Sequence, residues 1–331
     1  MKFAEPQLKF SKSFPKAQVL HPKRSLFIFD SVLEKNATFA KWAQAFPHRL
    51  AAISGEKLKE LRHFPELMEK ILNLTEHIQE RPLQVICVGG GSVGDFAGFV
   101  ASVLKRGVEL IQVPSTWLAA MDSAHGGKNA LNVAGIKNQI GTFHQPSQIW
   151  HIQELLFGQS EERLQDAYGE ALKISLLQGG DLYSRFAKIK SWDQIQLWKL
   201  LPSLVEAKYK IVRRDPFEKK GVRHLLNFGH TVGHVIESET GATHGRSVLL
   251  GMAFALEWSR ALNIFKGEMI SLPEHRNHLR QLKNSSRLLG QDKKRVAQSK
   301  LRFVFLNKPG KPVIRSVSIS DVLSEIERQK A

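Results

Sequence analysis

A chain of 331 residues is long enough for two ordinary domains, and its 42% hydrophobic and 8% aromatic content excludes a disordered protein. Lys and Arg number 48 against 31 Asp and Glu, so the formal net charge of +17 indicates either an anionic partner or a solvated basic surface. No apolar run approaches the ~20 residues that span a bilayer. Cys87 is the single cysteine, which excludes an intrachain disulfide and fits a reducing compartment, so we expect a cytoplasmic protein without membrane segments.

Short apolar runs alternate with helical patterns in the first half of the chain. We expect strands at Ser25–Phe29, Leu50–Ile53, Leu83–Val88 and Leu110–Val113, and helices at Leu58–Leu74 and Phe96–Leu104. Strand and helix in alternation are typical of a parallel sheet with helices on its faces. We therefore predict a Rossmann-like α/β domain over residues 1–158.

From about Glu161 onward the pattern is mostly helical. Near the end, Leu301–Leu306 and Val313–Val317 flank a turn at Asn307–Gly310, which predicts a hairpin. The second domain, residues 159–331, is therefore predicted to be mainly helical.

A glycine turn follows the buried strand LQVICV. Gly89, Gly91 and Gly94 satisfy the GxGxxG spacing between a strand and a helix, where backbone N–H groups can bind a pyrophosphate. A tight strand–helix turn without a ligand has the same spacing. Glu56, after an earlier strand, could bind a ribose or could only place a negative charge at a helix N-terminus.

Two histidines lie four residues apart, at His230 and His234, and share one face if they are helical. His244 follows, and Glu170 could add a carboxylate from a separate helix. Three such ligands are typical of a catalytic zinc site, although ordinary helix residues remain the alternative.

The segment Asp122–Gln145 is polar and rich in glycine, which argues against a regular core element. Its two lysines, Lys128 and Lys137, and its amide side chains could hold a phosphate or a carboxylate. A solvated loop is the alternative.

Nine motifs in this order resemble the 3-dehydroquinate synthase family, one of the sugar phosphate cyclases. They are GEKLK, GGGSVGDFAGF, RGVELIQVPSTWLAAMDS, HGGKNALN, GIKNQIGTFHQP, GEALK, GVRHLLNFGHTVGHVIE, THG and QDKK. The resemblance implies conversion of 3-deoxy-D-arabino-heptulosonate 7-phosphate to 3-dehydroquinate and phosphate in the shikimate pathway. It also implies NAD and a divalent metal, zinc or cobalt, as cofactors. The implied chemistry is transient oxidation, phosphate elimination, re-reduction and aldol closure.

The resemblance also assigns residues to roles. The implied metal ligands are Glu170, His230 and His244. The implied NAD site comprises Glu56, Lys59, Gly89, Gly90, Gly91, Ser92, Gly94, Asp95, Ser115, Thr116, Asp122, Lys137 and Asn138. The implied catalytic and substrate residues are Asp122, Lys128, Asn138, Lys173, Lys208, Arg223, Asn227, His234 and Lys294, with His234 as a proton carrier. Arg106 matches an arginine that reaches the partner's site, which implies a homodimer.

The chain departs from the family pattern at Trp117, His125, Asn129 and Arg246. Two alternatives therefore stay open, namely a related cyclase with another sugar phosphate and a metal-dependent polyol dehydrogenase. A basic scaffold that binds nucleic acid is a further alternative. Since no zinc-finger spacing or aromatic RNA-binding signature is present, we do not expect a nucleic-acid partner.

Overall fold

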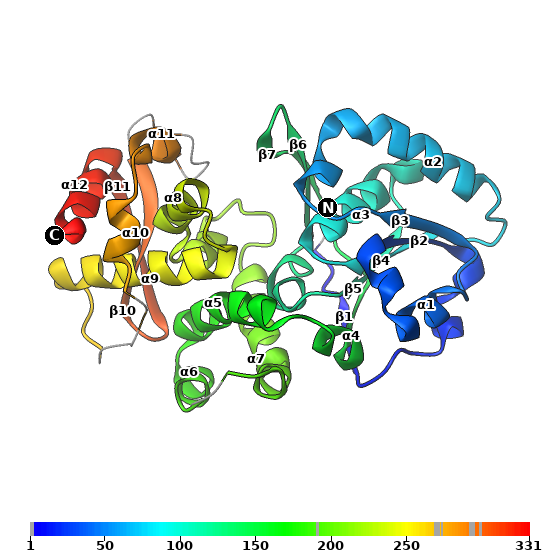
Figure 1. The fold of residues 1–331 in the computed structure, drawn as a ribbon, viewed down its shortest axis with the longest axis horizontal. Coiled ribbons are helices and arrows are strands. Elements are labelled where there is room, and N and C mark those ends of the chain that lie inside the picture. The colour runs from blue at the N-terminus through cyan, green and yellow to red at the C-terminus, as the bar shows by residue number, and fades with distance from the viewer. Residues whose placement is uncertain (1–2, 190–191, 268–271, 273, 291–294, 298–299) are drawn as a thin grey trace. The chain divides into compact units, whose positions relative to one another are not determined.

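The computed structural model describes residues 3–189, 192–267, 272, 274–290, 295–297 and 300–331 (Figure 1). The chain divides into two compact units, Met1–Arg163 and Leu164–Ala331. In the part of the chain so described, no helix combines the length and the apolar character that a membrane crossing needs.

A six-stranded sheet forms the centre of the first unit, with the strand order β1-β8-β5-β4-β2-β3. All of its pairings are parallel, which confirms the predicted α/β class. Its strands are β1 (Gln7–Ser11), β2 (Ser25–Asp30), β3 (His48–Ala52), β4 (Gln84–Gly89), β5 (Glu109–Pro114) and β8 (Gln148–Ile152). β3 lies beside β2 on one side of the sheet, whereas β4 and then β5 are added on the other side of β2. Ligands of such sheets bind at the carboxyl ends of the strands, at the point where the strand order reverses.

Helices cover both faces of the sheet (Figure 1). These helices are α1 (Ala37–Ala43), α2 (Phe64–Glu76), α3 (Gly91–Val103) and α4 (Gln153–Phe157). Side chains along a strand alternate between the faces, so Leu26 and Ile28 of β2 pack in the cluster with α2 and α3. Phe27 and Phe29 pack on the other face with α1 and α4. Each such burial stabilises the fold by roughly 1.5–3 kcal/mol.

Two predicted helices have different boundaries in the structure. The single helix expected at Leu58–Leu74 is wrong: two 3₁₀ turns, Glu56–Lys59 and Leu61–His63, precede α2. Pro65 lies in the first turn of α2, where its missing N–H costs nothing and its fixed φ favours a helix start. The other helix, expected at Phe96–Leu104, begins earlier at Gly91.

The polar segment after β5 has regular structure, contrary to the expectation. A π-helical turn, Ala119–Ser123, precedes the antiparallel hairpin of β6 (Lys128–Val133) and β7 (Ile136–Phe143). The turn Ala134-Gly135 has two positive φ angles, 51° and 76°, as type I′ hairpin turns require. Leu131 packs in the cluster with α3, so β6 is held against the domain although most of β7 is exposed.

The second unit is mainly helical, as predicted. Its helices are α5 (Glu161–Gln178), which begins at the end of the first unit, α6 (Gly180–Ala187), α7 (Gln194–Val212), α8 (His230–Thr240), α9 (His244–Ala261), α10 (Arg276–Arg280), α11 (Ser285–Gly290) and α12 (Ile319–Lys330). The predicted hairpin is confirmed as β10 (Lys300–Lys308) and β11 (Lys311–Ser318), and β9 (Arg295–Ala297) pairs with β10 as a third strand. Trp258 of α9 packs on Phe305 of β10, with ring centroids 5.1 Å apart.

Helices α5 and α9 approach each other closely because each carries a glycine at the contact. A Cβ atom at Gly169 would overlap the carbonyl oxygen of Gly245, and a Cβ at Gly245 would overlap the carbonyl oxygen of Asp166. The Asp166 carboxylate also accepts a hydrogen bond from the Gly245 N–H. This contact places Glu170 and His244, the residues next to these glycines, beside each other.

Candidate active site

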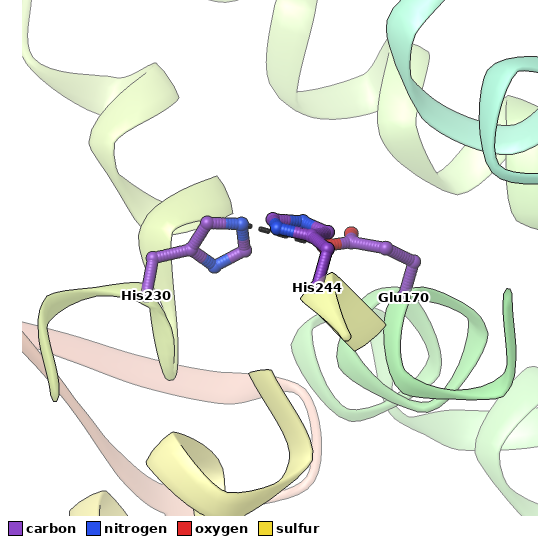
Figure 2. Close-up of side chains that lie close together, drawn as sticks. All are labelled: Glu170, His230 and His244. Atoms are coloured by element: carbon purple, nitrogen blue, oxygen red, sulfur yellow. Dashed lines mark ion pairs between the residues drawn. The ribbon is translucent and has the colours of Figure 1, made fainter. Parts of the chain in front are cut away.

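Glu170, His230 and His244 converge in the second unit (Figure 2). Glu170 lies in the middle of α5, whereas His230 and His244 are the first residues of α8 and α9. Nε2 of His230 and Nε2 of His244 each lie 3.3 Å from Oε1 of Glu170. Three helices that are separate in sequence therefore bring one carboxylate and two imidazoles to a single point.

Both imidazole rings are oriented through their other nitrogen. Nδ1 of His230 lies 3.2 Å from the carbonyl oxygen of Phe228, and Nδ1 of His244 lies 3.1 Å from Oε2 of Glu237. A carbonyl and a carboxylate oxygen only accept hydrogen bonds, so each Nδ1 carries a proton and donates it. Each Nε2 therefore faces Glu170.

Burial and the neighbouring charges together set the charge state of the cluster. Burial alone would raise the pKa of Glu170, but the Lys173 ammonium and the two imidazoles hold it well below its usual range. Burial and the charge of Lys173 lower the pKa of His230 to about 4, despite the attraction of Glu170. Burial would also lower the pKa of His244, but Glu170 and Glu237 raise it to about 10.

The donor set fits a divalent cation. Glu170 is fully buried, and among the described residues neither of its carboxylate oxygens has a partner with hydrogen-bond geometry, although Lys173 forms an ion pair with it. A buried carboxylate that faces two Nε2 atoms is the arrangement of a catalytic zinc or cobalt site with three protein ligands.

His234 lies one turn after His230 on α8, with ring centroids 5.3 Å apart, and its side chain is exposed. Its ring centroid is 6.2 Å from that of His244. His234, Glu237 and His244 form a second group whose ligand atoms lie within 4.8 Å of one another. His234 is thus beside the cluster and accessible to solvent.

Three cationic residues of the predicted substrate site are almost fully buried in the second unit. Lys173 is 1% exposed, Lys208 on α7 is 3% exposed and Arg223 is 4% exposed. Arg223 donates from its guanidinium to the Pro216 carbonyl at 2.9 Å. Asn227 ends the 3₁₀ turn Val222–Asn227, three residues before His230. Lys294, also predicted for this site, lies outside the described residues.

In the first unit, the glycine turn joins β4 to α3 at the carboxyl end of the strand. A Cβ at Gly90 would lie 3.1 Å from Cγ2 of Thr116, and a Cβ at Gly91 would lie 3.2 Å from Oγ of Ser123. Side chains at these positions would therefore crowd Thr116 and Ser123, and glycine leaves the N-terminus of α3 open to an anion. Oγ of Ser92 accepts a hydrogen bond from the Gly55 N–H at 3.0 Å.

A polar network ties four of the predicted NAD residues together. Nζ of Lys59 donates to Oδ2 of Asp95 and to Oδ1 of Asn138, each at 2.6 Å. Burial raises the pKa of Asp95, and the Lys59 ammonium opposes that rise. Oε2 of Glu56 accepts a hydrogen bond from Nδ2 of Asn132 at 2.8 Å, and Oδ1 of Asn132 accepts one from the Asn138 N–H at 2.9 Å.

Asn132 was not among the predicted site residues, although it is 1% exposed and connects Glu56 with Asn138. The signal that could have found it is the hairpin turn at Ala134-Gly135, which places β6 and β7 side by side. Without that pairing, Asn132 is one of several asparagines in a polar segment.

The remaining predicted residues of this unit lie in several places. Ser115 and Thr116 follow β5, and the Ser115 N–H donates to the Gly89 carbonyl at 2.9 Å. Asp122 lies in the π-helical turn, Lys128 begins β6, and Lys137 is exposed on β7.

Arg106 lies apart from these residues. It is exposed in the 3₁₀ turn Leu104–Arg106, with φ of 68°, just before β5 begins. Because β4 and β5 are parallel, this turn is at the amino ends of the strands, whereas the glycine turn is at their carboxyl ends.

The residues that depart from the family pattern mostly have structural partners. His125 is buried, stacks on His151 and lies 2.8 Å from the Ala120 carbonyl through Nε2. Asn129 is buried and donates to the carbonyls of Gly127 and His144. Arg246 is exposed, and burial together with its positive charge lowers the pKa of His278.

Two family models match consecutive parts of the chain. The N-terminal model of 3-dehydroquinate synthase matches residues 49–166, and the C-terminal model matches residues 167–299. The 3-dehydroquinate synthase of Bacillus pumilus is 32% identical over 313 residues, which cover 88% of this chain and 82% of that protein. That of Methylacidiphilum infernorum is 32% identical over 325 residues, which cover 92% and 88%.

The fold is shared with solved cyclases. A 2-deoxy-scyllo-inosose synthase complexed with carbaglucose-6-phosphate, NAD⁺ and Co²⁺ aligns with a TM-score of 0.77 at 23% identity, over 97% of this chain and 96% of that one. A 2-epi-5-epi-valiolone synthase from Streptomyces hygroscopicus with NAD⁺ and Zn²⁺ aligns with a TM-score of 0.78 at 17% identity, over 99% and 98%. Both halves of the family match in order, and relatives above 30% identity span most of the chain, so it belongs to the 3-dehydroquinate synthase family.

Proposed function

We propose that this chain converts 3-deoxy-D-arabino-heptulosonate 7-phosphate to 3-dehydroquinate and inorganic phosphate, as an NAD- and metal-dependent carbon–oxygen lyase. The observation that carries the proposal is the convergence of His230 and His244 on buried Glu170 in a chain of this family. A divalent metal at this cluster supplies Lewis-acid polarisation of a substrate hydroxyl. NAD bound in the first unit would supply a reversible hydride acceptor, and the ketone formed in the substrate would acidify the neighbouring C–H so that phosphate can leave.

The chain's own residues bind the substrate and move protons. Lys173, Lys208 and Arg223 would hold the phosphate and the carboxylate of the substrate, together with Lys128, Asn138, Asn227 and Lys294. Ammonium and guanidinium groups bind phosphate and carboxylate oxygens through charge-assisted hydrogen bonds, so three cationic side chains suit a substrate that carries both groups. His234 is exposed beside the metal cluster and would carry a proton to or from the substrate.

The first unit would hold NAD. The free N–H groups at the start of α3 are suited to the pyrophosphate, with Gly89, Gly90, Gly91 and Gly94 leaving room for it. Glu56, Lys59, Asp95 and Asn138 are fixed relative to one another by the Lys59 and Asn132 hydrogen bonds. Ser92, Ser115, Thr116, Asp122 and Lys137 complete the proposed shell.

The direct test is product formation. The pure protein is incubated with NAD, zinc or cobalt, and the heptulosonate phosphate, and both phosphate and dehydroquinate are assayed. We expect both products in equal amounts. Phosphate release with a different carbocycle from another sugar phosphate would favour a related cyclase, and no turnover of any sugar phosphate would reject the proposal.

Replacing Asn132 by alanine should weaken NAD binding. The change removes the hydrogen bonds that Asn132 makes with Oε2 of Glu56 and with the Asn138 N–H, and a hydrogen bond of this kind contributes about 0.5–1.5 kcal/mol. We expect the NAD dissociation constant, measured by titration of the metal-loaded protein, to rise on the order of 10-fold. Metal affinity should not change.

The matched control is Asn36→Ala in the same unit. Oδ1 of Asn36 accepts from the Phe39 N–H and caps α1, so its loss costs stability of about 1 kcal/mol without touching the network. If both variants weaken NAD binding equally, Asn132 only stabilises the domain.

We further propose a homodimer in which Arg106 reaches the phosphate site of the partner subunit. Arg106 is exposed at the amino ends of the strands, whereas ligands bind at their carboxyl ends. Arg106 is therefore poorly placed to bind a ligand in the site of its own chain. A two-fold interface would place it against the other copy.

Arg106→Ala should therefore weaken substrate use and spare metal and NAD binding. Loss of a charge-assisted contact of about 1.5–3 kcal/mol corresponds to a fall in kcat/KM on the order of 10- to 100-fold. The neighbouring exposed Lys105→Ala is the control. Mixing Arg106→Ala with inactive His230→Ala subunits should restore activity, and no restoration in subunits shown to exchange would refute a shared site.

The proposed partners are a sugar phosphate and a second copy of the chain, with no nucleic acid or membrane. We also propose a cytoplasmic location, because the single cysteine, Cys87, is buried and free.

A further inference from the structure

We infer that Glu237 is a positioning residue that commits His244 to the metal through Nε2, an inference that rests on the metal site of the proposed function. Glu237 lies in the last turn of α8, and His244 begins α9. The imidazole of His244 spans two carboxylates, with Nδ1 3.1 Å from Oε2 of Glu237 and Nε2 3.3 Å from Oε1 of Glu170. The family resemblance assigns three metal ligands but gives no role to Glu237, whose carboxylate faces this ring.

A neutral imidazole has one N–H and one lone pair. A metal-bound imidazole is neutral, and the Glu237 carboxylate can only accept, so in that state the proton stays on Nδ1 and the lone pair of Nε2 is available to the metal. The contact also fixes the plane of the ring, because rotation about χ2 would break it. Histidines that bind metals almost always donate their other nitrogen to such a partner, and loss of the partner typically costs 10- to 100-fold in metal affinity.

His230 is held in the same way by a different group, the Phe228 carbonyl at 3.2 Å. Backbone supplies the acceptor in one case and a side chain in the other. Only the His244 contact can therefore be removed by substitution, which makes Glu237 the residue at which the inference can be tested.

The backbone around Glu237 is fixed. Its carbonyl accepts from the Gly241 N–H at 3.1 Å, in the left-handed residue that ends α8. Three residues later α9 begins with His244. The short connection holds Glu237 and His244 opposite each other, so the contact does not depend on a flexible segment.

A competing arrangement would use Glu237 as a metal ligand. His234, Glu237 and His244 also have ligand atoms within 4.8 Å, and such a site would take the lone pair of Nδ1. His244 cannot offer both nitrogens to two ions while it stays a neutral imidazole. Glu170 is fully buried and faces Nε2 of both His230 and His244, whereas His234 is exposed, so the geometry favours the ion beside Glu170.

The test measures metal binding without NAD or substrate. Wild-type protein, Glu237→Ala and Glu237→Gln are stripped of metal and titrated with Co²⁺ and Zn²⁺ against a chelator, and the Co²⁺ absorption spectrum is recorded. Glu239→Gln is the matched control, because it lies on the same helix and its carboxylate accepts from the Lys283 and Asn284 N–H groups instead. Thermal melting of each metal-free variant checks folding.

We expect one metal per chain in all four proteins. Affinity should fall 10- to 100-fold in Glu237→Ala, fall less in Glu237→Gln because the amide oxygen can still accept, and stay unchanged in Glu239→Gln. The Co²⁺ spectrum should shift in Glu237→Ala, which a purely structural effect would not produce. Unchanged affinity in Glu237→Ala would overturn the inference.

Two metals in the wild type and one in Glu237→Ala would also overturn it, because Glu237 would then be a ligand. These results are separate from the substrate assignment. If affinity falls as expected but no dehydroquinate forms, the role of Glu237 stands and the proposed substrate is wrong. If the wild type binds no metal, both are wrong.

Discussion

His230→Ala should lose metal and activity together. The change removes one of three proposed ligands and leaves Glu170 and His244, which are too few to hold a catalytic ion in a fixed geometry. We expect metal affinity to fall by more than the roughly 10- to 100-fold that loss of an outer-shell partner costs. Metal content by atomic absorption after gel filtration, and phosphate release with the heptulosonate phosphate, measure the two effects.

The control is His278→Ala on α10, a histidine of the same unit that is outside the cluster. It should keep a full equivalent of metal. If His230→Ala also keeps a full equivalent, the assignment of His230 as a ligand is wrong.

Gly169→Ala should separate the helices that bring Glu170 and His244 together. The added methyl group would overlap the Gly245 carbonyl oxygen, and a backbone atom cannot rotate away as a side chain can. Overpacking of this kind typically costs about 1–3 kcal/mol of unfolding free energy, occasionally more. We expect a lower melting temperature and, because Glu170 is the next residue, weaker metal binding in the fraction that folds.

Gly158→Ala serves as the comparison. A Cβ at Gly158 would meet the Leu155 carbonyl oxygen at 3.5 Å, an ordinary van der Waals distance, and φ of −75° suits any residue. Its melting temperature and metal affinity should stay near those of the wild type. Normal metal binding in Gly169→Ala would show that the α5–α9 contact does not set the cluster.

The parts of the fold predicted from sequence are those whose pattern is local. β2, β4 and β5 are mostly apolar, and the layers on both faces of the sheet bury them. β1 was not predicted, because Gln7–Ser11 lies at the sheet edge and is mostly exposed, so it carries no apolar signal. The β6–β7 hairpin was also missed, since its stability comes from Leu131 packing against α3 and from the Ala134-Gly135 turn.

The candidate site was likewise predicted only where the sequence carries a local pattern. Motifs and the family resemblance gave the residues of the metal cluster, and the structure brings these three side chains to one point. Asn132 and Glu237 were missed because each acts through a contact that local spacing does not reveal. Asn132 meets Glu56 across 76 positions, and Glu237 meets His244 across the α8–α9 connection.

The most direct test of the proposed chemistry follows NADH and phosphate in one cuvette. The proposed reaction oxidises and then reduces the same substrate, so NAD is regenerated in every turnover. With NAD, metal and the heptulosonate phosphate, phosphate should exceed the enzyme concentration many-fold while absorbance of reduced nicotinamide stays below one equivalent of enzyme. NADH that accumulates mole for mole with consumed substrate, without phosphate release, would contradict the account and indicate a polyol dehydrogenase.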